Sequence, residues 1–341
     1  MSKIKVSVSD FVDPFRGLNG SNKLNISKIH FLKYGMTAGM PLFGGPGVPP
    51  LQALTLAMYK AIGISCALDF TSPYLKRSSS YSNLDPTEQA NISTWVGMAG
   101  AAFMADVNLD VSQLVHAGAL RKNGALQVSD FKSRRLADFV GQDTNGNWHV
   151  LEAKARQNNP SSKERIKWKT QAQTIATINN IAPTTQSYCY TKINNPCCLE
   201  LVDPPVREED TIRFWIDDFE LIRTYYKVLL EVLKDSDRKL MIGNNSIRYI
   251  MAGFDPITQT YIHVGMQDKV YNMIEREQNP PKIEPISEKP FFTKLEEIPD
   301  ERDFEQPENI IRDQFFLASD GVAVATSKYP NEIKIYDHRY Q

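Results

Sequence analysis

"RRLADFVGQDTNGNWHVLEAKAR", residues 134–156, contains two short apolar runs joined by a polar turn. "LADFVGQ" and "WHVLEAKA" alternate as strands do, and the Asn-Gly pair in "DTNGN" is a strong signal for a β-hairpin. The second run begins with apolar residues but ends in Glu152 and Lys154. The stretch therefore predicts a hairpin that is buried at one end and opens outward at a charged end.

Three charged side chains are expected to meet at that end. Side chains alternate between the two faces of a strand, so Glu152 and Lys154 share a face, and pairing through the turn brings Asp138 to it as well. Two carboxylates so close repel each other unless a positive group lies between them. Mg²⁺ suits them because it takes oxygen ligands and keeps several waters that a phosphate can displace. The sequence therefore predicts metal-assisted hydrolysis, with Lys154 orienting the water and offsetting negative charge.

A long helix is predicted before the hairpin. Asp85 and Pro86 are typical of an N-cap followed by a first-turn proline. The helix that they begin carries small residues, including Gly97 and Gly100, which let a helix approach a sheet closely. A short strand is expected within "DVSQLVHAG", between this helix and the hairpin.

A second helix is predicted after the hairpin. Ser161 and Glu164 match a capping box, and the helix is expected to run through about Asn180. "TTQSYCYTKI", residues 184–193, then has the composition of a strand. The order helix, strand, strand, strand, helix, strand is complete between residues 86 and 193.

The charged residues of the hairpin resemble a known motif. Asp138, thirteen intervening residues and then Glu152-Ala153-Lys154 are similar to the signature of the PD-(D/E)XK superfamily of restriction-endonuclease-like nucleases. Ala137 stands where that family usually has proline, which is not a metal ligand, so no ligand is lost by the change. A bare D…ExK also occurs by chance in many proteins, and here the predicted strands, turn and capped helices around it add weight.

The resemblance implies a fold and a set of site residues. The family core runs helix, three strands, helix, strand, which matches residues 86–193, about a third of the chain. In the family the two acids bind Mg²⁺ and the lysine supports the nucleophile, roles that pass to Asp138, Glu152 and Lys154. Some members add an acid from the first helix, for which Glu88 is the candidate ligand. A solvated first-turn glutamate is the alternative for that residue.

The second predicted helix is basic and has two further candidates. In the family a polar residue of this helix reaches the catalytic lysine or the phosphate, which points to Gln171, with Gln173 next. Phosphate contacts need a high density of positive charge, although any single lysine is equally typical of a solvated helix face. The candidate nucleic-acid-binding residues on this helix and the preceding strand are Arg156, Lys163, Arg165, Lys167 and Lys169.

Composition limits the class of protein. The 341 residues are 42% hydrophobic and 23% charged, as in a soluble globular protein with ample core. The net charge is −1, so binding to nucleic acid must come from a local patch rather than from the field of the whole chain. The most apolar early window, residues 51–70, is interrupted by Gln52, Lys60 and Asp69 and predicts a packed helix and strand rather than a membrane span.

Other chemistries find little support. The four cysteines form no CxxC pair, and adjacent Cys197 and Cys198 are poor disulfide partners, which fits a reducing cytoplasm. The start of the chain lacks the apolar core of a signal peptide. The five histidines form no HxxxH pair, and no GxSxG elbow is present.

Gly- and Pro-rich stretches divide the chain. "GMTAGMPLFGGPGVPP", residues 35–50, predicts a surface or lid loop, because it lacks the Lys-Ser/Thr pair of a phosphate loop. The predicted parts are an N-terminal elaboration (1–80), the nuclease-like core (81–204), a strand, long helix and hairpin packed on the core (205–276), a Pro-rich acidic linker or partner-binding arm (277–308) and a C-terminal β-rich segment (309–341).

Together these observations predict a fold and a function. The fold class is α/β, a restriction-endonuclease-like core with a mixed central sheet flanked by helices and α+β elaborations at both ends. The predicted function is a cytoplasmic, Mg²⁺-dependent nuclease, with Mn²⁺ as a substitute, that hydrolyses DNA in preference to RNA and serves restriction, defence or mobile-element biology. No membrane is expected as a partner, and a homo-oligomer is left open.

Two alternatives remain at this level. One is a catalytically silent nuclease fold that binds nucleic acid or acts as a scaffolding subunit, with a protein partner at residues 277–308. The other is a β-rich structural protein in which "LEAKAR" is only a charged strand edge.

Overall fold

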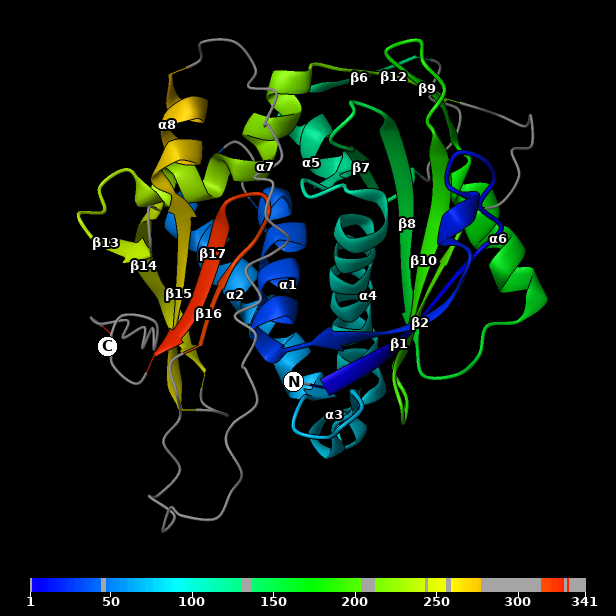
Figure 1. Cartoon of the computed structure of the whole chain (residues 1–341), viewed down its shortest axis with the longest axis horizontal. Helices are drawn as coiled ribbons and strands as arrows, with labels where there is room; N and C mark the ends of the chain where they lie inside the picture. The colour runs from blue at the N-terminus through cyan, green and yellow to red at the C-terminus, as the bar shows by residue number, and fades with distance from the viewer. Residues whose placement is uncertain are drawn as a thin grey trace. The chain divides into compact units, whose positions relative to one another are not determined.

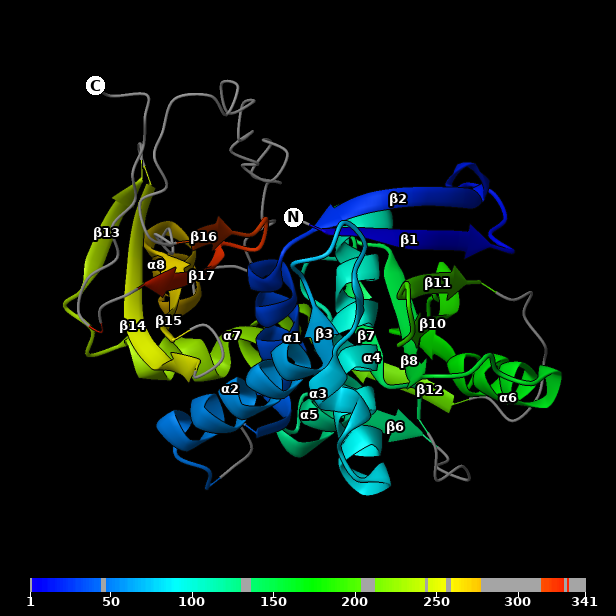
Figure 2. The same cartoon turned by 90° about the horizontal axis from the view of Figure 1, so that it is seen from below.

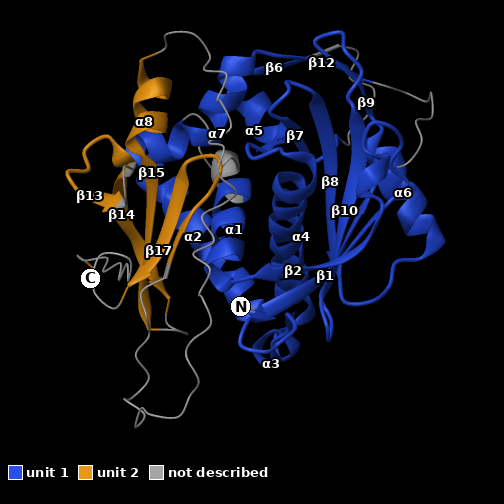
Figure 3. Ribbon diagram, viewed as in Figure 1, with its two compact units in different colours: residues 1–232 blue, residues 233–341 orange. Residues whose placement is uncertain are grey.

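The computed structural model is a mixed α/β protein (Figure 1). It describes residues 2–43, 47–129, 136–203, 212–242, 245–255, 259–276, 314–327 and 330. These described residues contain eight α-helices and four sheets. The chain divides into two compact units, residues 1–232 and 233–341 (Figure 3).

A seven-stranded mixed sheet is the centre of the first unit (Figure 2). Its strand order is β2 (Gly20–Ile26), β1 (Ser2–Ser9), β11 (Cys198–Val202), β10 (Thr185–Lys192), β8 (Trp148–Arg156), β7 (Phe139–Gln142) and β5 (Val115–His116). β1 runs parallel to β11, β8 runs parallel to β10, and the other neighbours are antiparallel. The predicted hairpin is thus β7–β8, inside the sheet rather than at its edge.

The N-terminal strands belong to this sheet. β1 pairs with β11 through five residues, and β2 pairs with β1. The predicted N-terminal elaboration therefore lies in the same compact unit as the predicted nuclease-like core. Alternation in "KIKVSVS" buries Ile4, Val6 and Val8 on one face and leaves lysines and serines on the other.

α4 (Pro86–Leu109) covers one face of the sheet. The side chain of Asp85 accepts hydrogen bonds from the backbone N–H groups of Thr87 and Glu88, which confirms the predicted cap. A Cβ at Gly97 would lie 3.0 Å from the carbonyl carbon of Lys154, and one at Gly100 would lie 2.3 Å from Thr191 Oγ1. These glycines let the helix lie directly against β8 and β10, as the sequence predicts.

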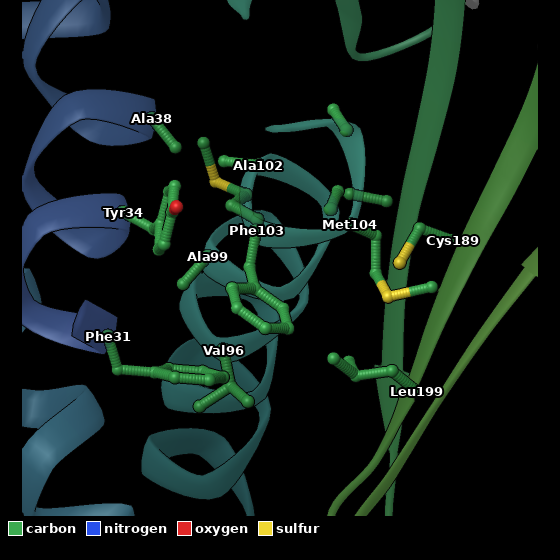
Figure 4. Close-up of a cluster of buried hydrophobic side chains, with 14 of the residues drawn as sticks. Phe31, Tyr34, Ala38, Val96, Ala99, Ala102, Phe103, Met104, Cys189 and Leu199 are labelled. Carbon is green, nitrogen blue, oxygen red and sulfur yellow. The ribbon is translucent and has the colours of Figure 1, made fainter. Parts of the chain in front are cut away.

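Aliphatic and aromatic side chains fill the space between α4, the sheet and an outer helical layer (Figure 4). Phe31 and Tyr34 enter this cluster from α1 (Lys28–Phe43), and Phe103 of α4 packs between them. α2 (Pro50–Ala67), followed by the short strand β3 (Leu68–Asp69), confirms the helix and strand predicted for residues 51–70.

The loop predicted for residues 35–50 is wrong over its first half, because α1 continues to Phe43. The reason lies in packing. A Cβ at Gly35 would lie 2.6 Å from Ile64 Cδ1, so this glycine permits α1 and α2 to touch. A glycine that serves a helix–helix contact looks the same in the sequence as one that serves a turn.

α6 (Ser162–Ala172) covers the opposite face of the sheet, where Trp168 packs against Tyr188 and Tyr190 of β10. Its capping box of Ser161 and Glu164 is present as predicted. The helix ends at Ala172, not near Asn180, because the chain turns into a short strand.

That strand, β9 (Ile175–Ile178), belongs to a separate three-stranded sheet. Its partners are β12 (Ile212–Ile216) in the centre and β6 (Leu126–Ser129) on the far side. The short helix α5 (Ala117–Lys122) and β6 also lie between β5 and β7, so the observed element order is longer than the predicted one. α7 (Asp218–Leu233) is the amphipathic helix expected after β12.

The second unit is built on a five-stranded antiparallel sheet with the order β13 (Lys239–Ile242), β14 (Asn245–Asp255), β15 (Thr260–Gln267), β17 (Val322–Ser327) and β16 (Gln314–Leu317). β14 and β15 form the predicted hairpin, and α8 (Asp268–Glu275) follows them. The predicted arm at residues 277–308 lies outside the described residues. In the part of the chain that is described, no helix is both long and apolar enough to cross a membrane.

Candidate active site

The β7–β8 hairpin sets the register of the site. Its turn is closed by Asp143, whose Oδ1 accepts hydrogen bonds from the backbone N–H groups of Asn145 and Asn147, and by Gly146 at φ +81°. Phe139 pairs with Leu151 and Val140 with Val150. One residue further along this register, Asp138 stands opposite Glu152.

The two predicted carboxylates lie together, as two reciprocal hydrogen bonds show. Asp138 Oδ2 accepts a hydrogen bond from the backbone N–H of Ala153 at 3.0 Å. Glu152 Oε2 accepts one from the backbone N–H of Asp138 at 3.2 Å. Each carboxylate is therefore held by a backbone N–H of the segment that carries the other.

Lys154 brings its ammonium group to both acids. Its Nζ donates a hydrogen bond to Glu152 Oε1 and lies 3.9 Å from Asp138 Oδ2. The Lys154 and Asp138 side chains are 26% and 28% exposed, so the pair is accessible from solvent. The three side chains predicted from the motif are thus in one cluster on one face of the sheet.

Glu152 is the buried member of the cluster, with no exposed surface. Burial, and next the negative charge of Asp138, raise the pKa of Glu152 to about 8, although Lys154 acts in the opposite direction. A buried carboxyl beside a second carboxylate is a site at which a further positive charge is stabilising.

The C-terminal end of α6 reaches the segment that carries Asp138 and leads into β7. Gln171 Nε2 donates a hydrogen bond to the carbonyl of Leu136 at 3.1 Å, two residues before Asp138. Gln171 is therefore placed to position Asp138 through the backbone. Gln173, the second choice from the sequence, is buried and lines a cleft on the other flank of the helix.

That cleft has a volume of about 410 Å³ and lies between α6 and strands β1 and β11. Two ion pairs line it: Arg165 with Glu200 at 2.8 Å, and Lys169 with Asp10 at 3.6 Å. Two of the four cations predicted on this helix for nucleic-acid binding are therefore committed to carboxylates.

The other two cations, Lys163 and Lys167, are exposed. Lys167 precedes Gln171 by four residues and is therefore its neighbour on the surface of α6, and Lys163 lies about one turn further towards the N-terminus. Arg156, at the end of β8, pairs with Glu164 at 3.0 Å, yet its side chain remains 53% exposed. Of the predicted contacts, these three have exposed side chains.

Glu88 does not join the cluster. It is exposed in the first turn of α4, and α4 covers the opposite face of the sheet. The neighbouring Gln89 accepts a hydrogen bond from Gln157, which lies five residues beyond Glu152, roughly 16 Å along an extended chain. Glu88 is therefore not placed to act as the predicted third ligand of the cation. Its backbone N–H takes part in the helix cap by donating to Asp85.

His149 also stays outside the site, as the alternation predicts. It is fully buried on the opposite face, its Nδ1 lies 2.9 Å from Thr185 Oγ1, and burial lowers its pKa.

Some site features could not be read from the sequence. Almost every residue type has a backbone N–H, so the sequence does not reveal that those of Ala153 and Asp138 bind the carboxylates. The counter-ion of Arg165 is Glu200, which is 35 residues away in the chain. Alternation along β11 could assign Glu200 to a face, but not to a partner.

Asp138 and Glu152 offer two acidic side chains to a cation, and the described residues contain no group of three or more His, Cys, Asp or Glu side chains that could hold a metal ion. Two carboxylates are the usual protein contribution to Mg²⁺, which keeps waters for the rest of its shell. The residues present therefore fit a hard divalent cation.

Comparisons of the chain with protein-family models, curated proteins and solved structures found no match.

Proposed function

We propose that this chain is a metal-dependent nuclease that hydrolyses phosphodiester bonds of DNA or RNA. One observation carries the proposal: Asp138, Glu152 and Lys154 come together at one accessible point of the central sheet, with Glu152 buried beneath the other two. A structural strand edge would place its charges outward and apart, where water solvates each of them.

In this proposal Asp138 and Glu152 supply the oxygen ligands for the cation. A bound divalent cation would lower the pKa of a water molecule that it binds and would neutralise the negative charge that develops on the phosphate. Burial of Glu152 keeps bulk water away from the inner side of the site, which strengthens each electrostatic interaction there. The exposed edge of Asp138 leaves the outer side open to substrate.

Lys154 has the role of orienting the attacking water and stabilising the negative charge on the phosphate. Its ammonium group has three donors, one of which bonds Glu152. The remaining donors can be directed at a water and at a phosphate oxygen. Gly97 of α4 lies against the backbone of Lys154, so the packing of α4 sets the position of β8.

We further infer that the core is restriction-endonuclease-like. α4, the β7–β8 hairpin, α6 and β10 follow one another in the chain, with α4 on one face of the sheet and α6 on the other. The extra elements α5, β6 and β9 are then insertions in that core.

The test is cleavage by the purified full chain. Plasmid, linear and single-stranded DNA and RNA are incubated in EDTA, Mg²⁺ or Mn²⁺ with wild type, Asp138→Asn and Lys154→Ala. Glu231→Gln, which removes an exposed carboxylate of α7, is the matched control. The proposal expects cation-dependent cleavage that both site variants lose and the control keeps. Activity that survives both site variants would assign cleavage elsewhere, and a wild type inactive on every substrate would contradict the proposal.

A catalytically silent, nucleic-acid-binding protein is the second candidate. It is favoured by the bond of Lys154 to Glu152, which gives the buried acid a positively charged partner from the chain itself. The same cleavage assay distinguishes the two, because the silent protein binds nucleic acid but leaves it intact with either ion.

A further inference from the structure

A line of positive charge crosses the central sheet on the face that carries the carboxylate cluster. The pairing register joins Lys23 of β2 to Lys5 of β1, Lys5 to Cys198 of β11, Cys198 to Lys192 of β10, and Lys192 to Arg156 of β8. Directly paired residues point to the same face of a sheet. Four of five consecutive positions across the sheet are thus cations.

This row lies on the same face as the proposed active site. Arg156 follows Glu152 by four residues on β8, so side chains at the two positions point the same way. The separation along the strand is roughly 13 Å, at about 3.3 Å per residue. The row itself spans roughly 19 Å, which is four strand spacings of about 4.8 Å.

The lysines of the row reach solvent, and none of them forms an ion pair with an acid among the residues that the structure describes. Lys5 and Lys23 are exposed and Lys192 is half-buried. Within the described part of the chain, Arg156 is the member of the row that forms an ion pair, with Glu164. Glu200, the nearest acid along β11 on this face, is paired with Arg165.

The end of the row at β2 is extended by an aromatic side chain. Lys23 Nζ donates a hydrogen bond to Tyr74 Oη at 3.0 Å and lies 5.3 Å from the centre of the Tyr74 ring. That bond and the charge of Lys23, with smaller effects of Lys3 and Lys5, lower the pKa of Tyr74. Exposed aromatic rings beside lysines are typical of surfaces that bind nucleic acid.

A chain of net charge −1 needs a local patch to bind a polyanion. A strand of duplex nucleic acid places one phosphate per 3.4 Å of axis, so the row matches about six nucleotides. We propose that Lys23, Lys5, Lys192 and Arg156 bind the phosphate backbone of a nucleic acid and hold it across the sheet beside the Asp138–Glu152 site. The proposal rests on the proposed function for the identity of the ligand, but binding along the row does not require cleavage.

The experiment measures binding of fluorescein-labelled DNA and RNA oligonucleotides by anisotropy in EDTA, where no cation supports cleavage. The row variant is Lys5→Gln, Lys23→Gln, Lys192→Gln. One matched control replaces the same three lysines by arginine. A second removes three lysines outside the row, on or just after α5 and α7: Lys122→Gln, Lys227→Gln, Lys234→Gln.

The row variant is expected to bind about 10–100-fold more weakly than wild type near 0.1 M salt. The slope of log affinity against log salt should fall by about 2–3, since each phosphate contact contributes about 0.7–0.9. Both control variants should bind as wild type does. Because the arginine variant keeps every charge, it also reports whether changes at these positions disturb the fold.

The outcomes separate this proposal from the proposed function. Equal binding and equal salt slope for the row variant and wild type overturn the row and leave the nuclease proposal standing. Weaker binding of nucleic acid by the row variant, together with a wild type that cleaves no substrate, supports the proposed binding row and contradicts the nuclease proposal. A wild type that binds anionic vesicles but no nucleic acid overturns the row as a nucleic-acid site, and the cleavage assay with Mg²⁺ or Mn²⁺ decides the nuclease proposal.

Discussion

Asp138 and Glu152 hold each other in place through their backbones: Asp138 Oδ2 accepts from the N–H of Ala153, and the N–H of Asp138 donates to Glu152. The geometry of the two acids is therefore a property of the β7–β8 pairing and does not need a bound ion. Such a site is preorganised, because its ligands are ordered before the substrate arrives.

Replacement of Asp138 by asparagine should separate folding from function. The amide oxygen still accepts the hydrogen bond from Ala153, so thermal unfolding should change little, while the charge that a cation needs is lost. Cleavage is expected to fall by at least ~10²-fold. A variant that unfolds at a much lower temperature would show that the charge of Asp138, and not its hydrogen bond, maintains the hairpin.

Glu152→Gln should stabilise the metal-free protein at alkaline pH. The pKa of Glu152 rises from 4.5 to about 8 on folding, so the folded state binds the extra proton between these values. The stability of wild type therefore falls as pH rises through this window, whereas the glutamine variant has no such loss. At ~1.4 kcal/mol per unit, the variant should be more stable at pH 8 by on the order of 2–4 kcal/mol.

Urea unfolding in EDTA at pH 5 and pH 8 measures this difference. Titrating groups that do not interact with Glu152 cancel in the comparison of variant with wild type. A difference in unfolding free energy that does not grow between the two pH values would mean that Glu152 ionises at an ordinary pH.

Gly97→Ala should displace β8. The added Cβ would lie 3.0 Å from the carbonyl carbon of Lys154 and 3.1 Å from the nitrogen of Ala155, both backbone atoms that cannot rotate away. We expect a loss of about 1–3 kcal/mol in unfolding free energy, together with reduced cleavage. Gly17→Ala is the matched control, since nothing lies within 4 Å of its Cβ. Equal stability of the two variants would show that α4 does not press on β8.

Gln171→Met should reveal a positioning residue. The change keeps the length of the side chain but removes the donor to Leu136. We expect kcat to fall about 5–30-fold, as for the loss of one hydrogen bond of about 1–2 kcal/mol, with KM nearly unchanged. A rise in KM without a change in kcat would instead place Gln171 in contact with the substrate.

Local signals in the sequence predicted the parts of the site that neighbours in the chain determine. The Asn-Gly turn fixes the β7–β8 register, and that register places Asp138 opposite Glu152. Asp85 and Ser161 cap their helices as their residue types and spacing predict.

Contacts between distant segments were beyond sequence reasoning. The pairing of β1 with β11 joins segments about 190 residues apart, and no local pattern specifies such a partner. The row of Lys5, Lys23 and Lys192 depends on that pairing. The helix expected to reach Asn180 ends early because Ile175 pairs with Ile212 of β12, a tertiary contact that overrides helix propensity.

The central claim is that Asp138 and Glu152 share one divalent cation, and titration calorimetry of the full chain with Mn²⁺ or Mg²⁺ at pH 8 tests it most directly. Wild type is expected to bind one ion at this site, and both Asp138→Asn and Glu152→Gln are expected to lose that binding. A wild type that binds no ion at millimolar concentration, or variants that bind as tightly as wild type, would contradict it.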